Sequence, residues 1–379
     1  METVTYRLGP LTVTISGANA VTRWASEEFR TLRSEGTADV SFQFSREPLK
    51  MGRPGGVGEE GLAVGRDYLG FQTRFFDVLV RSENDRTCVE LYQRDQRSLK
   101  RRSLSDLEEA WKVWLSHGGS LDIHPIKEFV YSIAPFVIQC ALLERGAALI
   151  HAGSLEVNGK GVLLPAWGGV GKSTLVSQSV MHGRAKFLAD DHAVVDASGT
   201  SHLYTLPIHL YAYHLEGDPE LKKRSFDTSS FIQQFQWYLG RKLRPRRAVR
   251  WKNPADIFPP SRISMASQIE EVIVMFRGWS PEFRWEECSP VEAARPCVGV
   301  ILGEISDFMR RTALAGCGAD VSCLPSLPRV CELLEKNYQT AFSKSRCIKL
   351  VIPKKATKDQ LIEFIKNRSS LMAMALDFS

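Results

Sequence analysis

The chain has 379 residues, of which 44% are hydrophobic and 24% are charged, and its net charge is +6. These proportions exclude a disordered, fibrous or membrane-embedded protein, and the length predicts two or three domains that each bury a core. A positive surplus of this size suits anionic ligands but does not by itself indicate nucleic acid.

The cysteine pattern and the apolar segments predict a cytoplasmic protein with no membrane partner. The eight cysteines include no Cys-x-x-Cys pair and no zinc-ligand spacing, which is typical of reduced thiols in a chain of this length. The first seven residues lack the basic start and apolar stretch of a signal peptide. The most apolar segment, residues 131–150, contains Gln139, Glu144 and Arg145, so we do not expect it to span a membrane.

Residues 1–122 are predicted to form a β-rich N-terminal domain. Its β-forming residues cluster between glycine and proline breaks, at Val4–Arg7, Leu11–Ile15, Val40–Phe44, Tyr68–Phe76, Val78–Arg81 and Cys88–Gln93. The glycine-rich piece Met51–Gly61 is predicted to be a loop. Because this region contains no catalytic cluster, we expect it to serve in substrate recognition or as a scaffold.

Two further regions are expected, residues 123–300 and an α/β C-terminal extension at 301–379. The first begins with apolar residues at helical spacing over Ile126–Leu143, which predicts a helix with one buried stripe, kinked at Pro135. The extension is predicted to contain a helix, a strand and a second helix. The three elements lie at 327–336, 348–352 and 358–367, and Thr357 and Gln360 have capping-box spacing for the last of them.

Residues 166–173 read Ala-Trp-Gly-Gly-Val-Gly-Lys-Ser, the Walker A pattern with Ala166 in place of the first glycine. A short apolar strand precedes them and a helix can follow from Thr174, which is the context that a phosphate-binding loop needs. The predicted nucleotide-binding residues are Gly168, Gly169, Val170, Gly171, Lys172, Ser173 and Thr174. Lys172 would reach the β- and γ-phosphates and Ser173 would ligate Mg²⁺, so the expected cofactors are ATP, or another nucleoside triphosphate, and Mg²⁺.

A hairpin places His151 beside this loop. Asn158-Gly159 separates two apolar runs, which is a strong signal for a two-residue β-turn. Val157 then pairs with Lys160, and this register sets His151 opposite Ala166. We therefore predict an active-site role for His151, either orienting an acidic neighbour or contacting the transferred phosphoryl group.

Paired aspartates interrupt the next apolar run, residues 186–195, at Asp190 and Asp191. A strand reached through one crossover helix would lie next to the phosphate loop in a parallel sheet. Phosphoryl transfer to an alcohol needs one carboxylate for the hydroxyl and another for Mg²⁺. We predict Asp190 as the base and Asp191 as a ligand of the metal or a partner of His151, with the reverse assignment left open. His192 is expected to face solvent or to pack.

This block resembles the catalytic domain of HPr kinase/phosphorylase and related HPr kinase-like proteins, some of which phosphorylate precursor peptides. The matching features are Ile150-His151, the Asn-Gly hairpin, residues 168–173 and Ala189-Asp190-Asp191, with His151 placed 21 residues before Lys172. The resemblance implies an α/β fold with a P-loop kinase core of the HPr kinase type, a mixed sheet flanked by helices, here joined to the N-terminal β-rich domain. It also implies transfer of a phosphoryl group to a serine hydroxyl, with His151, Lys172 and Asp190 or Asp191 as the catalytic positions. The glutamate- and arginine-bearing signature of that family is missing from this sequence.

A basic segment follows, residues 241–252, with seven basic residues and no acidic one. Pro245 and Gly240 predict a loop, in which Arg246, Arg247 and Arg250 are candidates to close over the phosphoryl group or to dock an acidic substrate. One loop with one aromatic residue, Trp251, does not favour nucleic acid as a partner.

These observations favour a kinase whose acceptor is a hydroxyl of a peptide, a protein or a small molecule. The alternative is a nucleotide-dependent switch or ATPase without a phosphoacceptor, and nucleic-acid binding ranks third. The sequence leaves open whether the chain forms a homo-oligomer.

Overall fold

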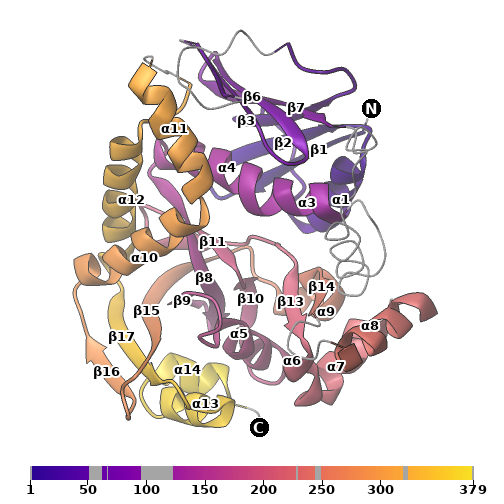
Figure 1. Cartoon of the computed structure of the whole chain (residues 1–379). Helices are drawn as coiled ribbons and strands as arrows, with labels where there is room; N and C mark the ends of the chain where they lie inside the picture. Colours follow the sequence, from indigo (N-terminus) through magenta and orange to yellow (C-terminus); the bar gives the residue numbers. More distant parts are fainter. Residues whose placement is uncertain are drawn as a thin grey trace.

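The computed structural model describes residues 2–50, 62–65, 67–94, 123–227, 229–243, 249–318 and 323–377. The fold is α/β, with two mixed sheets flanked by helices (Figure 1). The expected loop at Met51–Gly61 lies outside the described residues.

The first sheet has the strand order β1-β2-β3-β7-β6-β5-β4. Parallel pairing joins β2 to β3 and β3 to β7, and the other pairs are antiparallel. Burial alternates along β2 and β3, as expected for a sheet with one covered face, and α1 (Ala20–Glu28) packs on this sheet. Its strands are β1 (Glu2–Leu8), β2 (Leu11–Gly17), β3 (Val40–Ser45), β4 (Leu62–Val64), β5 (Tyr68–Gln72), β6 (Phe76–Glu83) and β7 (Arg86–Gln93).

The predicted strand Tyr68–Phe76 is wrong as a single element. The chain turns at residues 73–75, where the backbone N–H of Thr73 donates to Phe76 O at 2.8 Å, and β6 then runs back beside β5. Apolar residues on both sides of the turn gave the pattern of one long strand.

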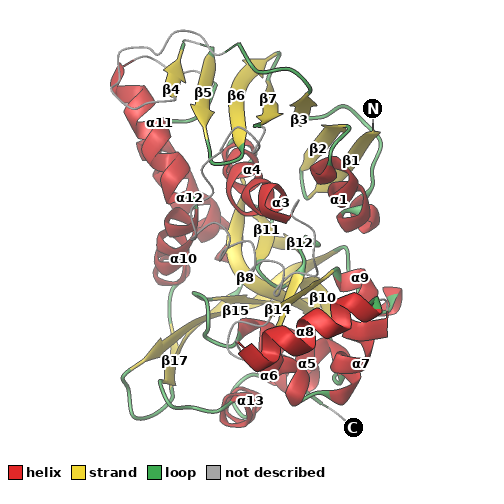
Figure 2. Cartoon of the chain, turned by 45° about the vertical axis from the view of Figure 1, so that its right-hand side comes forward, coloured by secondary structure: helices red, strands yellow, loops and turns green. Residues whose placement is uncertain are grey.

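The helical segment between the two sheets is partly exposed in its first half and completely buried in its second half. It consists of α3 (Ile123–Glu128), a π-helical turn at Phe129–Ile133 and α4 (Ala134–Leu143), in which Pro135 occupies the first turn. All ten residues of α4 are buried, because β3 packs on it from one sheet and β8 from the other (Figure 2). The predicted single buried stripe is confirmed over residues 126–133, where Ile126, Phe129, Val130 and Ile133 are buried between partly exposed neighbours, and it is wrong over α4. The helix His124–Leu143 is long and apolar enough to cross a membrane, but 78% of its most apolar window is buried inside the protein.

The second sheet is built around β8. Its N-terminal half pairs with β11, and its C-terminal half lies between β9 and β10, with all these pairs antiparallel. Further pairings of β9 with β15, β15 with β12 and β12 with β11 close a ring of five strands. The strands are β8 (Ala147–Val157), β9 (Lys160–Pro165), β10 (Lys186–Ala189), β11 (His192–Asp196), β12 (Thr200–His202), β15 (Ala266–Gly278), β16 (Arg284–Glu287) and β17 (Arg346–Pro353).

Residues beyond 300 complete this second sheet. β17 pairs in parallel with β15 and antiparallel with β16, so a boundary at residue 300 does not separate two sheets. Thr357 and Gln360 form the predicted capping box of α13. The remaining elements are α5 (Lys172–Met181), α6 (Ala212–Glu216), α7 (Pro219–Asp227), α8 (Phe231–Leu243), α9 (Pro254–Ile257), α10 (Pro290–Glu304), α11 (Ser306–Gly318), α12 (Leu327–Phe342), α13 (Lys358–Lys366), α14 (Ser370–Ala375) and the small sheet of β13 (Ile208–Tyr211) with β14 (Val249–Lys252).

Candidate active site

The glycine-rich loop joins the end of β9 at Pro165 to the start of α5 at Lys172, as the sequence predicts. Gly169 has a φ of +77° and Gly171 a φ of +123°, backbone conformations that glycine adopts without strain. A Cβ atom at Gly168 or Gly169 would meet nothing within 4 Å, so the space around these residues is open. Open glycine backbone next to a helix N-terminus is an arrangement that binds anions.

The remaining predicted loop residues are held in place by side-chain contacts. Lys172 is buried, and its Nζ donates to the carbonyl oxygen of Ala166 at 2.7 Å. Burial lowers the pKa of Lys172, and the charges of Asp191, Asp190 and Glu304 oppose that shift. Val170 is buried, and the Thr174 hydroxyl lies 3.2 Å from His214 Nε2. The Lys172 ammonium group thus closes the loop on itself, at the place where an anion would bind.

His151 lies at the predicted position. The observed register pairs Val157 with Lys160 and Ala152 with Pro165, and the backbone N–H of Ala166 donates to His151 O at 3.4 Å. Only 7% of His151 is exposed. The turn chemistry of Asn158-Gly159 is thus sufficient to bring a histidine to the edge of the glycine-rich loop.

The two aspartates reach the loop by a different route from the one predicted. We expected their strand to lie beside β9. Instead β8, the hairpin partner of β9, lies between β9 and β10. Asp190 and Asp191 fall in the break between β10 and β11, where the backbone N–H of Ala152 donates to Asp191 O at 3.1 Å. The strand that carries His151 therefore lies between β9 and β10, and Asp190 and Asp191 line the same cavity as the loop.

Asp190 and Asp191 have different surroundings. Asp190 is 5% exposed, and its carboxylate interacts with the Ser173 hydroxyl at the start of α5. Burial, with the charge of Asp191, raises the pKa of Asp190 to about 7, although the interaction with Ser173 and the charge of Lys172 oppose the shift. Asp191 is more exposed, and its Oδ1 lies 3.7 Å from His151 Nε2. The buried carboxylate therefore faces the loop serine, and the more accessible one faces the histidine.

Two further residues belong to this site, His192 and Glu304. His192 is buried, and its Nε2 lies 3.0 Å from Glu304 Oε2, while the other Glu304 oxygen contacts His151 Nδ1. Burial alone would raise the pKa of Glu304, but the hydrogen bonds and charges of the two histidines outweigh it and hold that pKa at about 2. Burial alone would lower the pKa of His192, but the Glu304 hydrogen bond and the Glu304 and Asp191 charges raise it.

The sequence offered little that could identify these two residues. His192 stands next to the paired aspartates, and we expected it to pack or to face solvent. Glu304 is the last residue of α10 and lies 112 positions beyond His192. Its role depends on where α10 ends against β8, and no local motif encodes that position.

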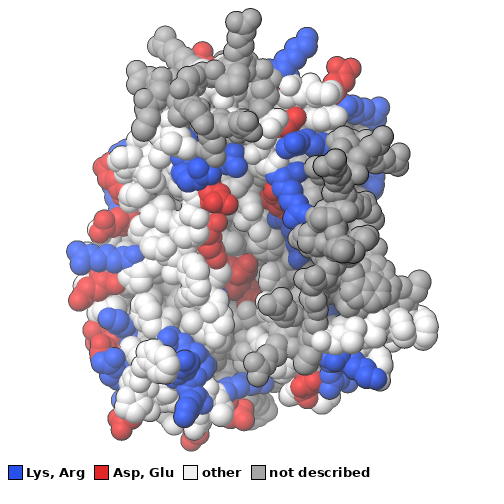
Figure 3. Space-filling model, viewed as in Figure 1, with Lys and Arg blue, Asp and Glu red and all other residues white. Residues whose placement is uncertain are grey.

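Two adjoining cavities open at the glycine-rich loop. One, of about 500 Å³, is lined by the loop, Asp190, Asp191 and the aromatic side chains of Tyr211 and Tyr213. The other, of about 420 Å³, is more apolar and is lined by residues that include Met275, Trp279 and Pro296. His151, Trp167 and Arg277 line both cavities. Acidic side chains are visible in the hollow at the middle of the face in Figure 3, and basic side chains form separate groups around it.

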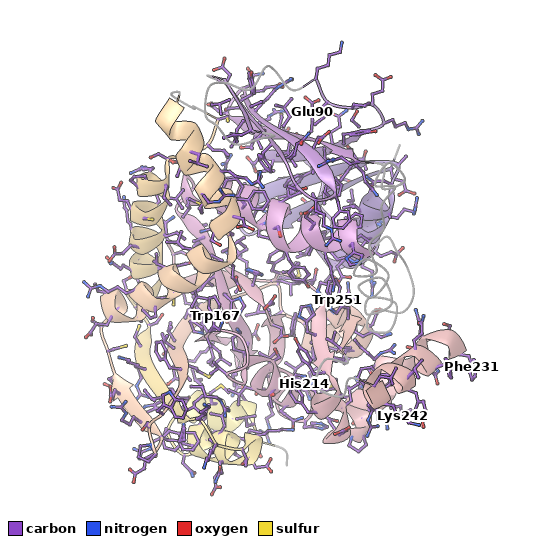
Figure 4. The ribbon with its side chains drawn as sticks, in the orientation of Figure 1. Glu90, Trp167, His214, Phe231, Lys242 and Trp251 are labelled. Carbon is purple, nitrogen blue, oxygen red and sulfur yellow. The ribbon has the colours of Figure 1, made fainter. Side chains whose placement is uncertain are left out.

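The basic segment is not the predicted loop over its described residues. Arg241 and Lys242 belong to the last turn of α8, and Val249–Lys252 forms β14. In Figure 4, Phe231 and Lys242 of α8 lie away from Trp167 and His214. Arg246 and Arg247 lie outside the described residues. The Arg250 guanidinium lies 4.2 Å from the centre of the Phe226 ring and donates to the Ser229 hydroxyl. Burial lowers the pKa of Arg250 to about 10. Arg250 therefore packs against α7 and does not close over the glycine-rich loop.

Comparison with known proteins adds only distant likeness among solved structures. No family model and no curated protein matches the chain. Among solved structures, it is similar to the Hpr(Ser) kinase/phosphatase from Coxiella burnetii with a TM-score of 0.26 and 11% identity, over 60% of this chain and 97% of that chain. A likeness at this level carries no inference about fold or activity, so any function must be supported by the site itself.

Proposed function

We propose that the protein is an ATP- and Mg²⁺-dependent kinase that transfers the γ-phosphoryl group to a hydroxyl of a peptide, a protein or a small molecule. One observation carries the proposal: Lys172, Ser173 and the buried carboxylate of Asp190 line the same cavity, and that carboxylate interacts with Ser173, the residue that follows the lysine of the glycine-rich loop. A loop lysine, a loop hydroxyl and a nearby carboxylate are the parts that P-loop enzymes use to bind a nucleotide with its metal.

The loop and the start of α5 bind the phosphates in this proposal. Backbone N–H groups at Gly168–Gly171 and the positive end of the helix dipole attract the anion. Lys172 leaves the carbonyl oxygen of Ala166 and pairs with the β- and γ-phosphates. Lys172 thereby exchanges a hydrogen bond to a neutral carbonyl group for an ion pair, which favours the bound state.

The residues present fit Mg²⁺. Mg²⁺ prefers oxygen ligands, and the Ser173 hydroxyl and the Asp190 carboxylate are both oxygen donors at the end of the loop. Asp190 Oδ1 is buried without a hydrogen-bond partner, which leaves it free to coordinate an ion. Ser173 and Asp190 would hold the ion, which supplies charge neutralisation between the β- and γ-phosphates. The surroundings of the two aspartates thus favour the reverse of the first assignment, in which Asp191 was the metal ligand.

Asp191 then remains for the acceptor. It is the more exposed of the two carboxylates, it lines the larger cavity, and it faces His151 Nε2. In this proposal Asp191 accepts the proton of the acceptor hydroxyl as the hydroxyl oxygen bonds to the γ-phosphorus and the bond from that phosphorus to the bridging oxygen of ADP breaks, which releases ADP. His151 orients the Asp191 carboxylate. Glu304 in turn fixes the His151 ring through Nδ1.

The test is acceptor-dependent transfer from γ-labelled ATP. The purified protein is incubated with labelled ATP, Mg²⁺ and a cell extract of its own source, and products that gain one phosphoryl group are identified by mass spectrometry. We expect a labelled product that disappears in Lys172→Met and Asp191→Asn. Slow ATP hydrolysis that no extract fraction stimulates would instead support a switch or ATPase and would contradict the kinase.

A further inference from the structure

Two histidines and two carboxylates, His151, His192, Glu304 and Asp191, form a closed cycle of contacts beside the glycine-rich loop, here called the ring. His151 on β8 and His192 on β11 are directly paired across two antiparallel strands, so their rings emerge on the same face, 5.6 Å apart. Glu304, the last residue of α10, contacts both rings on one side. Asp191 lies on the other side, with its carboxylate oxygens 3.7 Å from His151 Nε2 and 3.9 Å from His192 Nδ1.

We propose that His151, His192 and Glu304 form a binding site for a transition-metal ion of the Zn²⁺ class, separate from the Mg²⁺ of the nucleotide. The donor atoms are His151 Nδ1, His192 Nε2 and one oxygen of Glu304. One donor atom from each of the three residues can be chosen so that all lie within 4.8 Å of one another. Donor atoms around a tetrahedral zinc ion are about 3.3 Å apart, so only small side-chain rotations are needed.

The type of donor distinguishes this site from the Mg²⁺ site. Imidazole nitrogens suit Zn²⁺ and related ions, whereas Mg²⁺ takes oxygen ligands and water. Two histidines with one glutamate is a ligand set found in catalytic zinc sites, in which the fourth position stays open. His151 lines both cavities, so a ligand entering from either cavity can reach that position.

The second nitrogens of both histidines, which face away from the proposed ion, are buried and have no hydrogen-bond partner. His151 and His192 are 7% and 4% exposed, and the structure shows no hydrogen bond at His151 Nε2 or His192 Nδ1. Both of these atoms face Asp191 at distances too long for a hydrogen bond. Metal-bound histidines usually donate their second N–H to a carboxylate, which fixes the ring. Asp191 stands where that carboxylate is needed, on the side of both rings opposite Glu304.

The experiment uses Zn²⁺ alone, without nucleotide, on the full chain after removal of metals with a chelator. Isothermal titration calorimetry is expected to show one Zn²⁺ per chain, with a dissociation constant that millimolar Mg²⁺ leaves unchanged. Glu304→Gln and His192→Gln are expected to weaken binding by more than about tenfold. His202→Ala is the matched control, because this histidine pairs with Asp196 on the same sheet but outside the ring, and its Zn²⁺ affinity should not change.

Co²⁺ absorption identifies the ligands independently. Substituted Co²⁺ should give the visible bands of a four-coordinate ion with nitrogen and oxygen donors, and both ring variants should lose them. Circular dichroism of each variant separates loss of the ion from loss of the fold, and Glu304→Gln preserves the shape of the side chain. Three results would overturn the proposal: absence of stoichiometric binding, a Zn²⁺ affinity of Glu304→Gln and His192→Gln equal to that of the unsubstituted chain, or a thiolate charge-transfer band. Lys172→Met should still bind Zn²⁺, so failure of the kinase and failure of the metal site can be told apart.

Discussion

The ring of Trp167 lies against Gly303 so closely that a Cβ atom at position 303 would come within 3.2 Å of Cη2 of the indole. Trp167 belongs to the glycine-rich loop, and Gly303 precedes Glu304, which contacts His151. The last turn of α10 therefore touches both the loop and the histidine on β8. This contact couples the position of α10 to the conformation of the loop.

Substitution of Gly303 should expose this coupling. Alanine in place of glycine within a helix usually adds about 1 kcal/mol of stability. Gly299→Ala, on the same helix with nothing within 4 Å of its Cβ position, should show that gain as a higher melting temperature. Gly303→Ala should gain less and should bind a fluorescent ATP analogue more weakly, because Trp167 must move. Equal nucleotide affinity in the two variants would show that the indole does not support the loop.

Substitutions of the two aspartates should impair phosphoryl transfer in different ways. Asp190→Asn and Ser173→Ala are expected to raise the Mg²⁺ concentration needed for half-maximal transfer. Asp191→Asn is expected to lower kcat by about 10² to 10⁴-fold at saturating Mg²⁺, the range for loss of a general base. Steady-state rates over a Mg²⁺ titration make the comparison. If Asp191→Asn changes only the Mg²⁺ requirement, the two roles are exchanged.

Lys172→Met should separate stability from function. The Lys172 ammonium group is buried and bonded to a neutral carbonyl oxygen, so methionine removes a desolvated charge and fills a similar volume. The free energy of unfolding without nucleotide should stay level or rise, while transfer is lost. Urea unfolding and the transfer assay test this pair of outcomes. Lys160→Met, at the opposite end of β9 and exposed, is the control that should change neither property strongly.

Glu28 should make the stability of the protein depend on pH. Burial, with the charge of Asp256, raises the pKa of Glu28 to about 8 from an ordinary 4.5, and its Oε1 has no hydrogen-bond partner. The raised pKa means that the folded state retains a proton that the unfolded state releases. The protonated Glu28 side chain therefore contributes to the free energy of unfolding. This contribution is fully present below pH 4.5 and is lost as pH rises towards 8, by at most about 1.4 kcal/mol per pH unit.

Glu28→Gln should flatten this part of the pH profile and should make the protein more stable than the unsubstituted chain at pH 8. Thermal unfolding from pH 4.5 to pH 8.5 measures the difference between the two proteins. Glu27→Gln, one residue earlier and exposed, is the control that should keep the profile of the unsubstituted chain. A parallel profile for Glu28→Gln and the unsubstituted chain would mean that Glu28 is already ionised in the folded state.

Arg250→Met should act on stability and leave transfer unchanged. The substitution removes the contact of the guanidinium with Phe226 and the hydrogen bond to Ser229, a loss of about 1 to 2 kcal/mol. Urea unfolding should detect the loss, with kcat and KM for ATP unaffected. A large fall in kcat without a change in stability would return Arg250 to the list of groups that contact the phosphoryl group.

Features set by a few neighbouring residues could be predicted from the sequence, and features set by distant packing could not. Asn158-Gly159 fixes the register of its hairpin, and through it the place of His151. The glycine-rich loop and the capping box at Thr357 are equally local. The contact of Glu304 with both histidines depends on the docking of a whole helix, so it left no local pattern. The insertion of β8 between β9 and β10 likewise follows from strand pairing across the sheet, which the order of elements alone did not reveal.

The complete burial of α4 has a consequence for how this chain can be divided. A helix that is apolar on every face would expose a large hydrophobic surface if the strands before residue 94 were removed. A truncated chain that begins near residue 123 should therefore aggregate or need a replacement cover, although it would retain every residue of the candidate active site. The two sheets therefore depend on each other through α4, and any shorter version of this protein must supply a new partner for that helix.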